Sequence, residues 1–331
     1  MNGIYRLLYI AKGLIEGRPM ALCDVGDADG LTSAAIFLRK YPSGVVVFAA
    51  PRDVQSSRII RSINWTFVAD LPCPGKALIR ADHHRTNKPC AVHEYYDIDA
   101  PCSALMAMKA LGLEGDEVVQ ELVNVAIQTD TANITTKEAE LVDLAVKGSD
   151  YLGRLYLAHL LSREGVKGLL LDGRAQEWIG RAMKMKERML KIADSIPIKE
   201  ELALYFPRDV GISYRQLTIE LQHRGAVFVN VVARLGRRKF RLYCGADRES
   251  RYDCTQVATK LGGGGHKFAS GAEIKAPLLR PEAALDLFKN VLESYLGHGV
   301  EIMVVGETVI DSSRTVSTAP APRGPSSAAP P

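Results

Sequence analysis

The 331-residue chain lacks several features that would assign it to a special class of protein. Its six cysteines form no C-x-x-C pair, which argues against a zinc ribbon or a thioredoxin-like motif, so we expect buried free thiols. No apolar run is long enough to span a bilayer. The apolar residues 4–11 are not followed by a small-residue cleavage site, so they predict a first helix and a cytoplasmic protein without a membrane partner. No internal repeat is present.

A large net charge is also missing, since the formal value is only +4. The charge is unevenly distributed, however, because residues 208–251 contain ten Lys or Arg and only four Asp or Glu. This asymmetry indicates that one domain binds an anionic partner, while the acidic groups of the other domain have a different function. The basic strand-like residues of this segment either line a substrate cleft or form a solvated face.

The length predicts two domains, and the composition is that of a globular protein with a core of normal size. In the first half, strands predicted at residues 20–25, 45–49, 65–69 and 77–81 alternate with helices, and residues 103–161 are mainly helical. Such alternation is typical of a mainly parallel sheet with helices on both faces. The fold class is therefore α/β.

The second half begins with an amphipathic helix predicted at residues 175–196, which joins the two domains. Strands predicted at 202–206, 227–234 and 240–244, with helices at 214–223 and 253–261, form a smaller α/β domain. We expect a first domain at 1–172, a connecting helix at 173–197, a second domain at 198–311 and a tail at 312–331. The tail has five Pro, five Ser and no acid, and is expected to be disordered.

Acidic residues follow three of the predicted strands at the point where each strand ends. In an open α/β sheet, the loops beyond the carboxyl ends of the strands form the ligand crevice, so these residues are expected to converge. Gly30 permits the tight turn into the following helix. The acidic groups are Asp27 and Asp29 after the first strand, Asp70 after the third, and Asp82 with His83 and His84 after the fourth.

A fourth acid, Asp130, is predicted just past the C-terminal end of a buried helix, where the helix dipole disfavours a carboxylate by roughly 0.3–1 kcal/mol. A lone Asp after a strand is usually a turn or helix cap. Several carboxylates in one crevice repel one another unless cations neutralise them. Oxygen-rich sites with one or two imidazoles suit Mn²⁺ or Mg²⁺ better than zinc, and two such ions can clamp a phosphoryl group. The pattern therefore predicts a metal centre.

The second domain contains four consecutive glycines, Gly262 to Gly265, followed by His266. Backbone N–H groups without side chains in the way form anion-binding concavities. A flexible linker would continue in Gly, Ser or Pro, whereas Lys267 and Phe268 follow here. We therefore expect an ordered loop that binds phosphate or carboxylate.

Together these motifs resemble those of the DHH family of phosphoesterases, over about residues 21–274. The family includes the nanoRNase and pAp-phosphatase group and RecJ-like exonucleases. Asp27-Ala28-Asp29-Gly30 is similar to the first family motif, Asp70 to the second, Asp82-His83-His84 to the third and Asp130-Thr131 to the fourth. Gly263-Gly264-Gly265-His266 is similar to the glycine-rich motif of the DHH-associated C-terminal domain, which accompanies nucleotide-processing members.

The resemblance implies a centre of two Mn²⁺ ions, with Mg²⁺ or Co²⁺ as alternatives, that activates a hydroxide for attack on phosphorus. Asp27 would bind one ion, while Asp70 would bridge both. The other ion would be bound by Asp29, His83 and Asp130. Asp82 would orient the cluster, His84 would contact the scissile phosphate, and the motif Gly263 to His266 would hold the far end of the substrate.

Two departures from the family pattern affect these roles. Many members place a metal-binding His where this chain has Cys23 or Val25, so either Cys23 or Asp24 substitutes for it or the first ion binds weakly. The family's Ser-x-Arg segment before the glycine loop is also missing, and either Arg248 or Arg251 would take the place of its arginine.

The predicted function is hydrolysis of short oligonucleotides or nucleoside phosphates, with short RNA or single-stranded DNA as partner and a homodimer allowed. The two-domain length favours this function, since it is short for a processive RecJ-type nuclease. The first alternative is a RecJ-like single-strand exonuclease, which the basic segment supports. The second is a non-catalytic replication scaffold of the Cdc45 type, which only the missing histidine supports.

Overall fold

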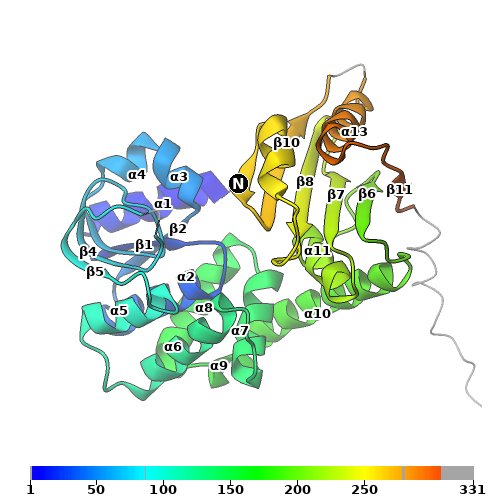
Figure 1. Ribbon diagram of the computed structural model, residues 1–331. Coiled ribbons are helices and arrows are strands. Elements are labelled where there is room, and N and C mark those ends of the chain that lie inside the picture. Colours follow the sequence, from blue (N-terminus) through cyan, green and yellow to red (C-terminus); the bar gives the residue numbers. More distant parts are fainter. Residues whose placement is uncertain (1, 86, 278–279, 307–331) are drawn as a thin grey trace, which may run out of the picture. The chain divides into compact units, whose positions relative to one another are not determined.

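The computed structural model describes residues 2–85, 87–277 and 280–306, and it has the mixed α/β architecture that the sequence predicts (Figure 1). The chain forms two compact units, one up to Met183 and the other from Lys184 onward. The division falls inside the long helix α10 (Gly173–Asp194). The tail predicted at 312–331 lies outside the described residues. Within the described ranges, no helix is long and apolar enough to cross a membrane.

The first unit is built on a five-stranded sheet in the order β2-β1-β3-β4-β5, in which every neighbouring pair is parallel. Strands β1 and β3 at its centre are short, mainly apolar runs that are largely buried on both faces, as a parallel sheet requires. The strands are β1 (Met20–Asp24), β2 (Val45–Ala49), β3 (Trp65–Ala69), β4 (Ala77–Asp82) and β5 (Ala91–Tyr96).

Helices cover both faces of this sheet (Figure 1). One face packs against α1 (Asn2–Ile15), α3 (Pro51–Ser56) and α4 (Arg58–Ser62). The other face supports a thicker helical layer. Its members are α2 (Ala28–Lys40), α5 (Ser103–Leu111), α6 (Glu117–Asp130), α7 (Lys137–Gly148), α8 (Tyr151–Glu164) and α9 (Lys167–Leu171).

The second unit contains a six-stranded mixed sheet in the order β11-β6-β7-β8-β10-β9. The β11-β6-β7 pairs are parallel and the remaining pairs are antiparallel. The strands are β6 (Glu201–Phe206), β7 (Phe228–Arg234), β8 (Lys239–Ala246), β9 (Gly264–His266), β10 (Ala269–Lys275) and β11 (Ile302–Val304). One face packs on α11 (Tyr214–His223), and the other packs on α12 (Cys254–Ala258) and α13 (Ala283–Leu296).

The expectation of six free thiols is right for four cysteines and wrong for two. Cys73 and Cys90 form a disulfide, whereas Cys23, Cys102, Cys244 and Cys254 are free and buried. Cys73 lies in the loop that leads into β4, and Cys90 directly precedes β5. Because β4 and β5 are parallel neighbours, their entry loops lie side by side, a proximity that sequence spacing does not reveal.

The sheet order predicts a ligand crevice at the ends of β1 and β3. The chain leaves β1 for β2 on one side, while β3 lies on the other side, and ligands bind at such a switch point. Gly30 lets α2 begin close against the end of β1, since a Cβ at this position would lie 2.3 Å from the carbonyl oxygen of Asp24.

Candidate metal centre

Asp27 and Asp29 are fixed by the first turn of α2. Asp27 is the N-cap residue, and its Oδ1 accepts hydrogen bonds from the N–H groups of Asp29 and Gly30. Asp29 is only 1% exposed, and its two oxygens accept hydrogen bonds from the backbone N–H groups of Ser103 (2.7 Å) and Ala104 (2.8 Å). Its carboxylate therefore lies at the N-termini of both α2 and α5, where helix dipoles favour negative charge.

Asp70 directly follows β3 and has a φ of 60°, which lies in the left-handed region that few residues other than glycine adopt. The buried side chain accepts a hydrogen bond from Ser103 Oγ (3.1 Å), and its Oδ1 lies 3.4 Å from Nδ1 of His84. Unusual backbone conformations of this kind concentrate at functional sites. Ser103 thus contacts Asp29 through its backbone and Asp70 through its hydroxyl.

Asp82 is fully buried at the end of β4 and is saturated with hydrogen bonds. Its Oδ1 accepts from the backbone N–H groups of His83 and His84 and faces Nδ1 of His84 at 3.0 Å. Its Oδ2 accepts from Arg80 and Asn87, both at 2.7 Å. This carboxylate therefore holds the His83-His84 segment in place and has little capacity left for a metal ion.

His83 carries the most informative contact of the site. Its Nδ1 lies 3.0 Å from the carbonyl oxygen of Ala100 and must donate to it. In the neutral imidazole, Nε2 then presents a lone pair. Nε2 is buried without a hydrogen-bond partner and faces carboxylate oxygens of Asp130 at 3.5 Å and Asp29 at 4.0 Å. A cation between these groups would remove the repulsion between the Nε2 lone pair and the carboxylate oxygens. A metal-binding His usually donates its other N–H to a carbonyl or carboxylate, as His83 does here.

Three overlapping groups of side chains in the described part of the chain could each hold a metal ion, with ligand atoms within 4.8 Å of one another. They are Asp29, His83 and Asp130; Asp24, Asp27 and Asp70; and Asp70, His83 and His84.

Of the two substitutes predicted for the missing histidine, only Asp24 lies in such a group. Its Oδ1 is buried without a hydrogen-bond partner. Cys23 belongs to none of the groups, and burial, followed by the charge of Asp70, raises the pKa of its thiol.

Burial and mutual repulsion make four carboxylates of this site hard to ionise without a cation. Burial, with Asp27 as the main charged neighbour, raises the pKa of Asp29 to about 7 and that of Asp24 to about 6. Burial also raises the pKa values of Asp70 and Asp130. The hydrogen bond to Asp82 raises the pKa of His84, which favours its charged form. A divalent cation would stabilise this arrangement at neutral pH.

Sequence reasoning missed Arg80, which is fully buried in β4. Its guanidinium contacts Oδ2 of Asp82 at 2.7 Å and Oε2 of Glu94 at 2.9 Å. The sequence contains a sign of this role, because Arg80 interrupts an apolar strand and lies two residues before Asp82. Residues two apart in a strand share one face of the sheet. Ser103 and Asn87 were also missed, since a single hydroxyl or amide gives no pattern in one sequence.

The predicted substrate-binding residues belong to the second unit. Gly264 to His266 form the edge strand β9 paired with β10, so the prediction of an ordered segment is right. Arg248 is exposed, and the guanidinium of Arg251 lies 5.2 Å from the centre of the Tyr252 ring. Some of the basic residues of the second unit have partners, since Lys239 pairs with Glu273 and Arg238 donates to the carbonyl of Ala276.

Two adjacent glycines offer a matched test of this segment. A Cβ at Gly263 would lie 2.1 Å from the carbonyl oxygen of Gly271, whereas a Cβ at Gly264 would meet nothing within 4 Å. We therefore expect Gly263→Ala to displace β9 and destabilise the second unit, and Gly264→Ala to leave the melting temperature unchanged. Differential scanning calorimetry measures both. Equal melting temperatures for the two variants would show that β9 does not pack as described.

Comparison with known proteins agrees with this fold. No protein-family model and no curated protein matches the sequence. Among solved structures, the chain is similar to the pGpG-specific phosphodiesterase PggH of Vibrio cholerae, with 18% identity and a TM-score of 0.62 over 82% of this chain and 99% of PggH. It is also similar to Mn²⁺-bound RecJ of Thermus thermophilus, with 17% identity and a TM-score of 0.55 over 90% of this chain and 55% of RecJ.

A third similar structure is the DHH domain of a member of a family of ribosomal proteins, with 14% identity and a TM-score of 0.52 over 87% of this chain and 89% of that one. The chain therefore has the DHH-domain fold, as its motifs suggested. It spans about half the length of the Thermus RecJ and nearly all of PggH.

Proposed function

We propose that this chain is a metal-dependent phosphoesterase that cleaves phosphodiester bonds in short single-stranded nucleic acids or dinucleotides. The proposal rests on Nε2 of His83, which is buried, has no hydrogen-bond partner and faces the carboxylates of Asp29 and Asp130. No side chain of the described residues satisfies this nitrogen, and a divalent cation would. The similarity to a phosphodiesterase and an exonuclease agrees with the proposal.

The donor set suits a pair of hard divalent cations, and we propose Mn²⁺. Asp29, His83 and Asp130 would hold one ion, and Asp24, Asp27 and Asp70 the other. Carboxylate oxygens with a single imidazole favour Mn²⁺ or Mg²⁺ over zinc, which prefers thiolates and several histidines. The bound ions would polarise the phosphate and supply a nucleophile at neutral pH.

The residues around the ions would then position the substrate. His84 is about half exposed and its pKa is raised, so it can donate a proton to a phosphate oxygen. Asp82 accepts a hydrogen bond from His84 and fixes the orientation of its ring. We propose that the N–H groups at the β9 edge and His266 bind a distal phosphate, with Arg248 or Arg251 as the arginine partner.

A short substrate is favoured by the extent of the structural match. The chain covers 99% of PggH, whose substrate is pGpG, but only 55% of the Thermus RecJ. A RecJ-like exonuclease is the second candidate, because residues 208–251 carry ten basic and four acidic residues. Binding of a long single strand would then be tight and would weaken steeply with salt.

Hydrolysis of a 5′-labelled ladder of RNA and DNA, from a dinucleotide such as pGpG to a twenty-mer, tests the proposal in Mn²⁺ and in EDTA. We expect Mn²⁺-dependent loss of the shortest strands. Preferential loss of long DNA would assign the RecJ-like function instead. No cleavage of any strand, together with no Mn²⁺ binding by calorimetry, would favour a non-catalytic scaffold.

The choice between Asp24 and Cys23 as substitute ligand gives a separate prediction. Asp24→Asn should weaken Mn²⁺ binding and lower hydrolysis about tenfold or more, because Asp24 belongs to a ligand group. Cys23→Ser is the control and should retain Mn²⁺ affinity, because this thiol belongs to none of the ligand groups and burial keeps its pKa raised. Isothermal titration with Mn²⁺ measures both, and the reverse order of effects would assign the thiolate.

A further inference from the structure

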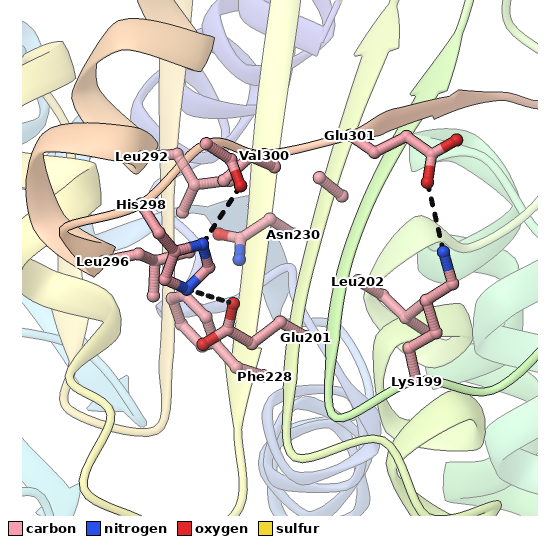
Figure 2. Close-up of a pocket in the computed structure, with 12 residues that line it drawn as sticks. Lys199, Glu201, Leu202, Phe228, Asn230, Leu292, Leu296, His298, Val300 and Glu301 are labelled. Carbon is pink, nitrogen blue, oxygen red and sulfur yellow. Dashed lines mark hydrogen bonds and ion pairs between the residues drawn. The ribbon is translucent and has the colours of Figure 1, made fainter.

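The second unit contains a pocket of about 180 Å³ that no motif of the sequence predicted (Figure 2). It lies between strands β6 and β7, helix α13 and the connection from α13 to β11. The pocket is lined by apolar side chains, including Phe228 of β7 and Leu292 of α13. Its polar part is formed by Asn230, Glu201 and His298. Every residue that forms it belongs to the second unit.

Asn230 is the unusual residue of this pocket. It is 1% exposed, and its Oδ1 is buried with no hydrogen-bond partner among the described residues. It shares its face of β7 with the buried Phe228 and Val232, so an amide interrupts an otherwise apolar layer. Buried polar groups are almost always paired, and an unpaired one costs free energy. Figure 2 shows the amide directed towards the part of the pocket where Glu201 and His298 meet.

The polar part of the pocket is rich in hydrogen-bond acceptors. Glu201 accepts from the hydroxyl of Tyr252 through Oε1 (2.6 Å), and its Oε2 lies 3.1 Å from Nε2 of His298. Each carboxylate oxygen can accept a further hydrogen bond. His298 also has its Nδ1 occupied, at 3.0 Å from the carbonyl of Gly299.

Neither basic residue of the lining is free for an anion. His298 pairs with Glu201, and Lys199 pairs with Glu301 at 3.1 Å at the opposite end of the pocket (Figure 2). A phosphate group would therefore meet carboxylates rather than an unpaired cation. The chemistry favours a neutral ligand that donates hydrogen bonds.

We propose that this pocket binds a single planar heterocycle with adjacent N–H donors, which is the chemistry of the pairing edge of guanine. The N1–H and the exocyclic amine of guanine would donate to Glu201 and to Oδ1 of Asn230, while the ring contacts Phe228 and Leu292. The pocket is smaller than the about 300–1,000 Å³ of sites for drug-sized ligands, so it suits one base. Adenine would present a lone pair beside its amine and would oppose the carboxylate.

Titration calorimetry with guanosine in EDTA tests this site without involving the metal centre, since guanosine has no phosphate to hydrolyse. We expect saturable binding of one guanosine per chain, with adenosine binding about tenfold or more weakly. Asn230→Leu should weaken guanosine binding about ten- to hundredfold without lowering the melting temperature, because it removes an unpaired amide. Glu273→Gln, on β10 and outside the pocket, is the matched control and should bind guanosine like the wild type.

Absence of saturable binding to the wild type at about 1 mM guanosine would overturn the proposal. So would equal affinity for adenosine, or unchanged guanosine affinity in Asn230→Leu. If Asn230→Leu does not fold, Glu201→Gln provides the second variant. It replaces one acceptor oxygen with a donor and should abolish the preference for guanosine over adenosine, and a retained preference would refute the assignment. Because guanosine binding and metal-dependent hydrolysis are measured separately, either can fail alone.

Discussion

Asp130→Asn is expected to lower metal-dependent hydrolysis by more than about a hundredfold while leaving the metal-free protein at least as stable as the wild type. Loss of an outer partner of a metal ligand already costs about 10–100-fold, and loss of a ligand should cost more. Asp130 is the most direct position for this test, because its carboxylate lies 3.5 Å from the unpartnered Nε2 of His83 and accepts no backbone N–H among the described residues. Asp29, in contrast, accepts two backbone hydrogen bonds, so its replacement would also disturb the fold.

The expected stability of metal-free Asp130→Asn, relative to the wild type, follows from the pKa of Asp130. Burial raises this pKa above its usual 3.8, and the charge of Asp27 adds to the effect. The folded protein therefore holds this proton more tightly than the unfolded chain, and stability is lost as pH rises from 3.8 through the raised value. Asparagine does not titrate, so this loss of stability is absent from Asp130→Asn. The free energy of unfolding of the metal-free variant should match that of the wild type near pH 4 and equal or exceed it at pH 7.

Thermal unfolding with and without Mn²⁺ measures this effect beside the hydrolysis assay. Mn²⁺ should raise the melting temperature of the wild type, because the proposed site exists only in the folded chain, and should raise that of the variant less. Asp143→Asn, on the neighbouring helix α7 and outside the ligand groups, is the matched control. Equal Mn²⁺ shifts in Asp130→Asn and the wild type would exclude Asp130 as a ligand.

Arg80→Met should destabilise the first unit by about 3–5 kcal/mol, because it leaves a buried carboxylate without its cation. Both Arg80 and Asp82 are fully buried, and their charged atoms are 2.7 Å apart. Glu94 would lose its cation as well, although it is partly exposed. Methionine fills much of the same volume, so the loss is electrostatic rather than a cavity effect.

Tryptophan fluorescence during denaturation measures this loss selectively. Both tryptophans of the chain, Trp65 and Trp178, belong to the first unit. Lys147→Met is the control, since it breaks an exposed pair with Asp143 and should cost no more than about 0.5 kcal/mol. If Arg80→Met lowers the free energy of unfolding as little as the control does, the hydrogen bonds to Asp82 are sufficient to stabilise its charge without Arg80.

The sequence predicted the first sheet and the positions of its acidic residues because these depend on local pattern. An apolar strand followed by a carboxylate is visible in a single sequence, and parallel strands end at the same edge. It missed β5, an edge strand whose His93 and Glu94 interrupt the apolar pattern and which pairs only with β4. The Cys73–Cys90 disulfide was missed because it depends on which loops meet in space.

In the second unit, too, the features that depend on contacts between distant segments were not predicted from the sequence. Asn230 reads as one polar residue in an apolar strand, and only the packing of α13 over β7 turns it into part of a pocket. The prediction included no element between residues 276 and 306, although α13 is clearly amphipathic and occupies much of this stretch. That Asp24 rather than Cys23 lies in a candidate ligand group likewise depends on the positions of side chains.

The proposed metal ligands lie far apart along the chain, which has a consequence for when a cation could bind during synthesis. Asp24 and Asp27 come from the end of β1 and the start of α2, Asp70 follows β3, and Asp130 ends α6. A ribosome must therefore release the chain past Asp130, well into the first unit, before both proposed ligand groups exist. The group of Asp24, Asp27 and Asp70 is complete earlier, but its carboxylates must be brought together against their own repulsion. Binding of a cation to the proposed group that includes Asp130 would thus be a late event in biosynthesis, and a cell short of that cation would accumulate a folded but less stable apo form.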